Sequence, residues 1–126
     1  MEPAKTNCPP SDILIVEDDP IIALDFEDTF LGFGVKTVRS AGSVAHALVL
    51  IGERAPDFAL LDVGLIREKS FEVAARLAAL KIPFVFVTGY GGDRVDAIFA
   101  DRPRLPKPCS SDALLTVLRR FGRPQC

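Results

Sequence analysis

The fold of this chain is decided by residues 13–20, which read Ile-Leu-Ile-Val-Glu-Asp-Asp-Pro. Four consecutive apolar residues, three of them β-branched, predict a short strand that is buried on both faces of a sheet. Three carboxylates follow this strand directly. Because like charges this close repel one another, burying them together is costly unless a positive charge lies among them. A divalent cation that prefers oxygen ligands, such as Mg²⁺, is the obvious candidate.

The composition is that of one globular domain, with 126 residues of which 48% are apolar and 25% are charged. The charges are unevenly spread: residues 1–63 carry 4 Lys/Arg and 11 Asp/Glu, whereas residues 64–126 carry 11 and 6. This split argues against a uniformly basic nucleic-acid-binding surface, so we expect no direct contact with nucleic acid. The sequence lacks an apolar run of membrane-spanning length, and Pro9-Pro10 stand where a signal peptide would need its apolar core. We therefore expect a cytoplasmic protein that does not bind membranes.

The three cysteines, Cys8, Cys109 and Cys126, are odd in number and scattered, and they lack the CxxC spacing of zinc sites. We expect reduced thiols.

The rest of the chain alternates predicted strands and helices. Residues 1–11 are polar and rich in proline, and we expect them to form a flexible leader. The predicted strands cover about 12–16, 35–39, 58–61, 84–87 and 104–106, and the predicted helices about 20–33, 43–54, 70–80, 94–100 and 110–121. Five strands alternating with five helices predict an α/β fold with a parallel sheet, helices on both of its faces and right-handed crossovers.

Ligands of such sheets bind outside the carboxyl ends of the strands. Glu17 and Asp18 follow the first predicted strand, Asp62 ends the third, Thr88 ends the fourth and Lys107 follows the fifth. Residues far apart in the sequence are therefore expected at one edge of the sheet. A carboxylate beside bound Mg²⁺ can attack a phosphoryl group, and such transfer needs mainly positioning and neutralisation of charge.

Two further polar residues are given structural roles. Asp19 suits the N-cap of the first helix, where its charge also stabilises the helix dipole, so we leave it out of the metal site. The only histidine, His46, lies within a predicted helix and is interpreted as an ordinary helical residue.

At this point the sequence resembles a known family. The resemblance is carried by residues 13–19 (Ile-Leu-Ile-Val-Glu-Asp-Asp), 57–62 (Asp-Phe-Ala-Leu-Leu-Asp), 86–89 (Phe-Val-Thr-Gly) and 105–108 (Leu-Pro-Lys-Pro). Their order and spacing are similar to the signature stretches of bacterial two-component response-regulator receiver domains. The resemblance covers residues 12–126 and implies a flavodoxin-like (βα)5 domain whose doubly wound sheet has the strand order 2-1-3-4-5.

The resemblance implies that Asp62 accepts a phosphoryl group from a sensor histidine kinase or a histidine phosphotransfer protein. Asp18, Asp62 and the backbone carbonyl of Gly64 would bind Mg²⁺ directly, and Glu17 would act largely through water. The chain would be a signalling phosphoprotein of a phosphorelay and not an enzyme with turnover on external substrates.

The same resemblance implies roles at the two later strand ends. Thr88, followed by Gly89, would supply the switch hydroxyl, and Lys107 would contact the phosphoryl group. The Lys107–Pro108 peptide bond is expected to be cis, as is common in this family.

The sequence departs from the family at one position. Typical receivers carry Tyr or Phe three residues before the lysine, and Arg104 stands there. Residues 83–90 (Pro-Phe-Val-Phe-Val-Thr-Gly-Tyr) are similar to the hallmark of a single-domain subgroup, the FAT GUY receivers, in which that aromatic is replaced. We hypothesise that Tyr90 takes part in switching instead; otherwise it is an exposed loop residue.

The resemblance also implies where partners bind. The first helix would contact the kinase, and residues 94–121 would form the readout surface. We expect no output domain, so the signal would pass through a downstream protein partner or by phosphotransfer. Arg119, Arg120 and Arg123 make the end of the last helix basic, which by itself is only a favourable charge at a helix C-terminus.

Three other functions remain open. A degenerate receiver would keep the fold and bind partners without being phosphorylated. A nucleotide- or flavin-binding domain would need a phosphate cradle after the first strand, where Glu17, Asp18 and Asp19 would repel phosphate. A phosphatase with an aspartyl nucleophile would usually carry a second Asp two residues after it, at the position of Gly64.

Overall fold

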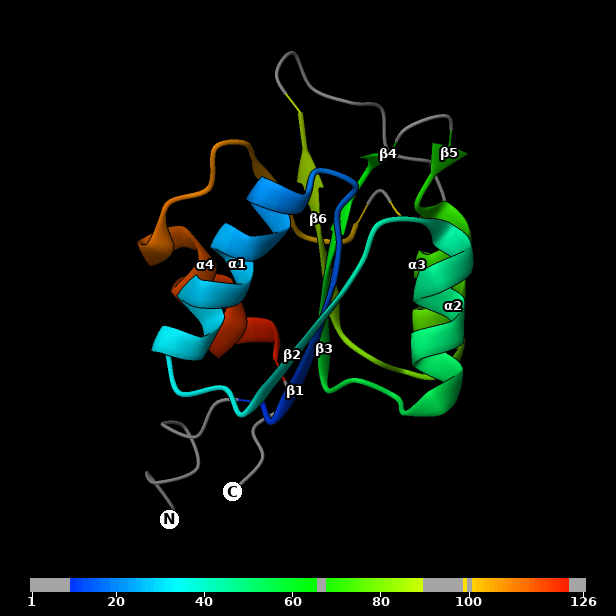
Figure 1. Cartoon of the computed structure of the whole chain (residues 1–126), viewed down its shortest axis with the longest axis horizontal. Helices are drawn as coiled ribbons and strands as arrows, with labels where there is room; N and C mark the ends of the chain where they lie inside the picture. The colour runs from blue at the N-terminus through cyan, green and yellow to red at the C-terminus, as the bar shows by residue number, and fades with distance from the viewer. Residues whose placement is uncertain (1–9, 66–67, 90–98, 100, 123–126) are drawn as a thin grey trace.

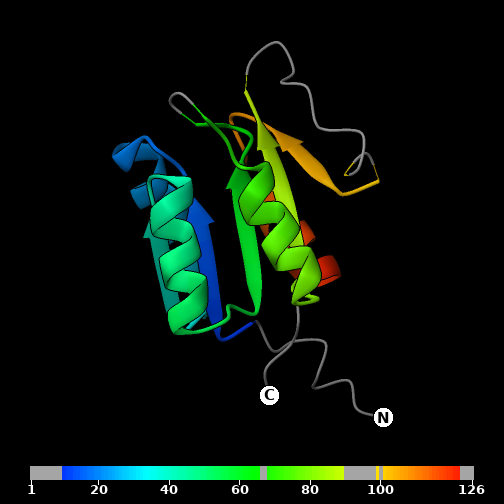
Figure 2. The same ribbon diagram turned by 90° about the vertical axis from the view of Figure 1, so that its right-hand side faces the viewer.

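The computed structural model describes residues 10–65, 68–89, 99 and 101–122. Its centre is a five-stranded parallel sheet in the order β2-β1-β3-β6-β7, made of β1 (Asp12–Val16), β2 (Thr37–Ala41), β3 (Phe58–Asp62), β6 (Phe84–Thr88) and β7 (Arg104–Pro106). Two helices, α1 (Pro20–Gly32) and α4 (Ser111–Phe121), cover one face, and α2 (Val44–Glu53) and α3 (Phe71–Ala79) cover the other (Figure 1, Figure 2).

The predicted α/β class and strand order are confirmed. When only the sheet strands are counted, β2-β1-β3-β6-β7 is the order 2-1-3-4-5. The fourth predicted helix, about 94–100, lies outside the described residues except for Phe99. Within the described part of the chain, no helix is both long enough and apolar enough to cross a membrane.

Two local predictions differ from the structure. A short antiparallel hairpin, β4 (Gly64–Leu65) with β5 (Glu68–Lys69), stands where a loop was expected. The second strand begins two residues later than predicted, because the backbone N–H of Val35 donates to Phe30 O at 3.3 Å and so belongs to the turn that closes α1. Gly34 makes this turn possible with a φ of 98°, a conformation that costs glycine little.

The core forms two layers because successive strand residues face opposite sides of the sheet. Ile13 and Ile15 pack in the layer beneath α1 and α4, whereas Leu14 and Val16 pack in the layer beneath α2 and α3. Strands β3 and β6 alternate in the same way, and all of their residues are buried. This arrangement explains the uninterrupted apolar runs of the sequence.

Helices α1, α2 and α4 begin at residues whose side chains cap them. The Asp19 carboxylate accepts hydrogen bonds from the N–H groups of Ile21 and Ile22, and Pro20 occupies the first turn of α1. Ser43 and Ser110 cap α2 and α4 through their hydroxyl oxygens. His46 lies exposed in the first turn of α2, as expected of an ordinary helical residue.

The packed part of the chain begins before β1. Pro10 is buried, and the N–H groups of Ser11 and Asp12 donate to Asp57 Oδ2 at 3.1 and 3.0 Å. The backbone of Ser11 is therefore bonded to the turn before β3.

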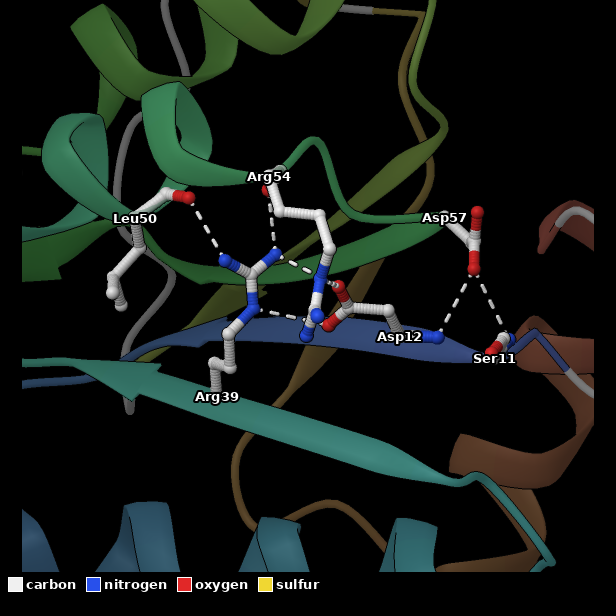
Figure 3. Close-up of polar contacts among 6 residues, drawn as sticks. All are labelled: Ser11, Asp12, Arg39, Leu50, Arg54 and Asp57. Atoms are coloured by element: carbon white, nitrogen blue, oxygen red, sulfur yellow. Dashed lines mark hydrogen bonds and ion pairs between the residues drawn. The ribbon is translucent and has the colours of Figure 1, made fainter.

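At the amino end of the sheet, a single guanidinium joins three elements (Figure 3). Arg39 on β2 donates from Nε and Nη2 to the carboxylate of Asp12, which is 6% exposed, at 3.1 and 3.0 Å. Arg39 also donates to the carbonyl oxygens of Leu50 and Arg54 at 2.8 and 2.7 Å, which satisfies the end of α2. The Arg54 side chain adds a contact to Asp12 at 2.7 Å but is 59% exposed.

This network makes a prediction about stability. Arg39→Met should lower the free energy of unfolding by about 3 kcal/mol, because the buried Asp12 carboxylate loses its main partner and the α2 carbonyls lose their donors. Arg54→Met, the matched control, should cost about 1 kcal/mol or less, because its ion pair is exposed. Urea unfolding followed by circular dichroism measures both. Equal losses in the two variants would contradict the account.

Candidate functional site

Three carboxylates meet at the carboxyl edge of the sheet. Glu17 directly follows β1, and its N–H continues the ladder by donating to Ala41 O at 3.0 Å. Asp62 is the last residue of β3. Oxygen atoms of Glu17, Asp18 and Asp62 lie within 4.8 Å of one another, and Glu17 and Asp62 are only 3% and 5% exposed. The sheet thus brings Asp62 next to two acidic residues that lie 44 and 45 positions before it in the sequence.

Lys107 supplies positive charge to this cluster. Its Nζ lies 2.8 Å from Glu17 Oε1 and 2.9 Å from Asp62 Oδ2. The backbone fixes its position, because the Lys107 N–H donates to Thr88 O at 2.9 Å and so extends the pairing of β6 with β7. The Lys107–Pro108 bond is cis, as expected.

Burial and charge set the protonation of the site. Burial raises the pKa of the Glu17 carboxyl to about 7; the charge of Asp62 adds to this rise, and contacts with Lys107 and the Asp19 N–H oppose it. Burial alone would lower the pKa of Lys107, but its hydrogen bonds and charge interactions with Glu17 and Asp62 outweigh this effect, so the pKa is raised. Lys107 therefore remains a cation, while Glu17 can hold or release a proton near neutral pH.

The cluster has the donors that a hard cation needs. It offers three carboxylate oxygens close together, and oxygen is the ligand that Mg²⁺ prefers. Asp62 Oδ1 accepts the Gly64 N–H at 3.1 Å, and Oδ2 accepts from Lys107, so both oxygens are held in place. A metal here would share these oxygens with the ammonium or displace it. The carbonyl of Gly64 as a ligand stays a prediction.

The remaining site residues stand near the same edge. Thr88 ends β6 and is 7% exposed, and its hydroxyl donates to Leu105 O over 3.5 Å, a contact long enough to be weak. Gly89 follows it. Tyr90 lies outside the described residues, so its role in switching stays a hypothesis. Arg104, at the position of the family's aromatic, is exposed on β7.

A pocket beside Lys107 was not foreseen from the sequence. It measures about 420 Å³, lies between α1 and the segment after β7, and is lined by Ile22, Asp25, Phe26, Lys107, Pro108 and Cys109. The Cys109 thiol donates to Pro106 O at 3.4 Å, and burial raises its pKa, so the thiol stays neutral. Phe26 is buried on α1, and the packing of this helix beside the segment after β7 creates the pocket. In the sequence, the only indication of this pocket is that Cys109 follows Lys107 by two residues.

Comparisons with known proteins agree with this geometry. A family model for the response regulator receiver domain matches residues 13–119. The solution structure of SdrG from Sphingomonas melonis Fr1 is similar at 45% identity, with 86% of this chain and 92% of that chain covered and a TM-score of 0.77. A putative response regulator from Chloroflexus aurantiacus J-10-fl is similar at 26% identity, with 88% and 96% covered and a TM-score of 0.74.

Curated relatives match over shorter stretches. A putative transcriptional regulator of Pseudomonas aeruginosa is 39% identical over 72 residues, which are 57% of this chain and 35% of that protein. The phyllosphere-induced regulator PhyR of Methylorubrum extorquens is 31% identical over 83 residues, 64% of this chain and 31% of that protein. The chain spans less than half the length of each of these relatives. Because the family model covers most of the chain, including all three clustered carboxylates and Lys107, the chain belongs to the response regulator receiver domain family.

Proposed function

We propose that Asp62 accepts a phosphoryl group from a histidine of a sensor kinase or phosphotransfer protein, in a reaction that requires Mg²⁺. One observation carries the proposal. The buried Asp62 carboxylate lies at the ligand-binding edge of the sheet, within 4.8 Å of oxygens from two other carboxylates and 2.9 Å from the Lys107 ammonium. This combination of a nucleophile, a metal-binding set and a cation is what phosphoryl transfer needs.

In the proposed reaction, an Asp62 oxygen attacks phosphorus as the bond to the donor's imidazole nitrogen breaks, and the imidazole keeps the electron pair. Lys107 would offset the negative charge of the transferred group, and the Thr88 hydroxyl would donate to one of its oxygens. Bound Mg²⁺ would neutralise further charge on the same oxygens. The product is the protein's own aspartyl phosphate, so the reaction is signalling and not turnover of an external substrate.

The donor would dock beside α1. Ile21 and Leu24, three residues apart on this helix, are 78% and 56% exposed and offer apolar surface for a protein contact. The pocket that ends at Lys107 adjoins the same helix. A cytoplasmic donor domain would meet this surface, and the phosphorylated chain would then signal to a downstream protein or pass the group on.

Phosphorylation is tested by intact mass. Incubation with Mg²⁺ and acetyl phosphate should add one phosphoryl group to the wild type, because Asp62 is the nucleophile in place. Asp62→Asn should add none, and Asp28→Asn, which changes an exposed carboxylate of α1, should behave as wild type. Addition to Asp62→Asn would overturn the assignment. A wild type that takes up no phosphoryl group, even from a histidine phosphotransfer donor, would favour a degenerate receiver.

Mg²⁺ binding should depend on pH through Glu17. Below its pKa of about 7 this carboxyl carries a proton and coordinates poorly, so the affinity for Mg²⁺ should rise as pH increases from 6 to 8. Glu17→Gln should weaken Mg²⁺ binding and remove this dependence on pH. Isothermal titration calorimetry at several pH values measures it; an equally steep pH dependence in Glu17→Gln would exclude Glu17 as its source.

Lys107→Ala should have opposite effects on Mg²⁺ affinity and on the rate of phosphorylation. Removing a cation 2.9 Å from Asp62 should strengthen Mg²⁺ binding about fivefold, because the ammonium competes for the same oxygens. The rate of phosphorylation by acetyl phosphate should fall at least about tenfold, because charge neutralisation is lost. Lys36→Ala, on the exposed surface, is the control. If both quantities moved in the same direction, the two roles given to Lys107 would be wrong.

A further inference from the structure

A second pocket lies at the amino end of the sheet, opposite the carboxylate site. It measures about 460 Å³ and is formed by the end of α3, the segment before β6, the segment before β7 and the end of α4. Its apolar lining includes Ile82, Pro83 and Phe121, and its polar lining consists of Lys81 and Arg102. We refer to it as the Phe121 pocket. None of the described residues that line it is acidic.

Aromatic rings hold two cations at this pocket. The Arg102 guanidinium lies 4.7 Å from the centroid of the Phe84 ring, and that of Arg120 lies 5.5 Å from the centroid of the Phe121 ring. Cation–π contacts of this kind fix a guanidinium without neutralising its charge. Lys81 adds a third positive charge from the turn after α3. Lys81 and Arg102 therefore line the pocket, and Arg120 lies beside it through its contact with Phe121.

Three other cations of the described chain are paired with carboxylates. Arg39, Arg54 and Lys107 each contact a carboxylate at 3.0 Å or less. Within the described part of the chain, Arg102 and Arg120 form ring contacts but no ion pair with a carboxylate. Their charge is consequently available to a ligand.

We propose that the Phe121 pocket binds a short acidic segment of another protein, with one large apolar side chain of that segment seated on Ile82, Pro83 and Phe121. The charge of the pocket is complementary to Asp and Glu, and the apolar floor has room for a Leu or Phe side chain. The overall net charge of −2 and the acidic first half of the chain disfavour nucleic acid, which needs an extended basic surface. The proposal goes beyond phosphorylation of Asp62 and does not depend on it.

The experiment titrates the ¹⁵N-labelled full chain with a synthetic peptide, acetyl-Glu-Asp-Glu-Leu-Phe-Glu-Asp-Glu-amide. We expect saturable shifts at the amides of Ile82, Phe121 and Gly122, with a dissociation constant on the order of 100 µM, and small shifts at Glu17 and Asp62. A peptide with Gln and Asn in place of Glu and Asp should not bind, and one with Ala in place of Leu and Phe should bind more weakly.

Charge reversals test the named cations. Arg102→Glu and Arg120→Glu should each weaken peptide binding at least about fivefold. Arg119 and Arg120 are both exposed on α4 and neither lines the pocket, but Arg120 lies over the ring of the lining residue Phe121. The matched control is therefore Arg119→Glu, which makes the same change of charge and should bind within about twofold of wild type. If Arg102→Glu fails to fold, Arg102→Gln replaces it and should weaken binding in the same direction.

Three results would overturn the proposal. Shifts that do not saturate, or that centre on α1, would place no site at the Phe121 pocket. Equal weakening by Arg119→Glu would show a general effect of charge. Binding to phosphatidylserine vesicles that depends on Arg102 and Arg120, with no binding of the peptide, would assign the pocket to an anionic membrane surface instead.

Discussion

The carboxylate site depends on one ammonium group. Lys107 Nζ lies 2.8 Å from Glu17 and 2.9 Å from Asp62, two carboxylates that are almost fully buried, with Asp18 beside them. Without a cation these groups would repel one another in a region of low dielectric constant. The protein's own lysine therefore stabilises the carboxylate cluster, and a metal or phosphoryl group that binds there must share the oxygens that Lys107 contacts. Because of this contact, Mg²⁺ or a phosphoryl group would compete with the Lys107 ammonium for the same carboxylate oxygens.

Much of this arrangement could be predicted from the sequence, because buried parallel strands leave a clear pattern. The run Ile13–Val16 has no polar residue, and the polar residues that follow each strand must meet at one edge once the strands are parallel. Asp19, Ser43 and Ser110 mark helix starts through hydrogen bonds to residues at most three positions away, so local sequence suffices to find them. The closeness of Glu17, Asp18, Asp62 and Lys107 follows from these two kinds of signal alone. Their roles in phosphoryl transfer came from the family resemblance and remain proposals.

Other features depend on contacts that no local pattern encodes. Arg39 reaches Asp12, 27 residues away in sequence, and the end of α2, and nothing around Arg39 distinguishes it from a solvated strand residue. The strands of the β4–β5 hairpin have two residues each, which is too short to show the alternation of apolar and polar residues that marks a strand. Val35 has the β propensity of a strand residue, yet its N–H belongs to the turn that closes α1, because β2 begins only at Thr37. Both pockets arise where elements far apart in the sequence pack together, so their linings could be known only from the fold.

The sheet separates two chemically different ends. Its carboxyl edge gathers acidic side chains around Lys107, and its amino edge carries the Arg39 network and the cations of the Phe121 pocket. The central claim concerns the carboxyl edge, that Asp62 is the phosphoryl acceptor. Borohydride reduction of the phosphorylated protein converts an acyl phosphate to an alcohol, and tandem mass spectrometry of its peptides locates the modified residue. The account predicts reduction of Asp62 alone; a reduced side chain at Glu17 or Asp18, with Asp62 intact, would contradict it.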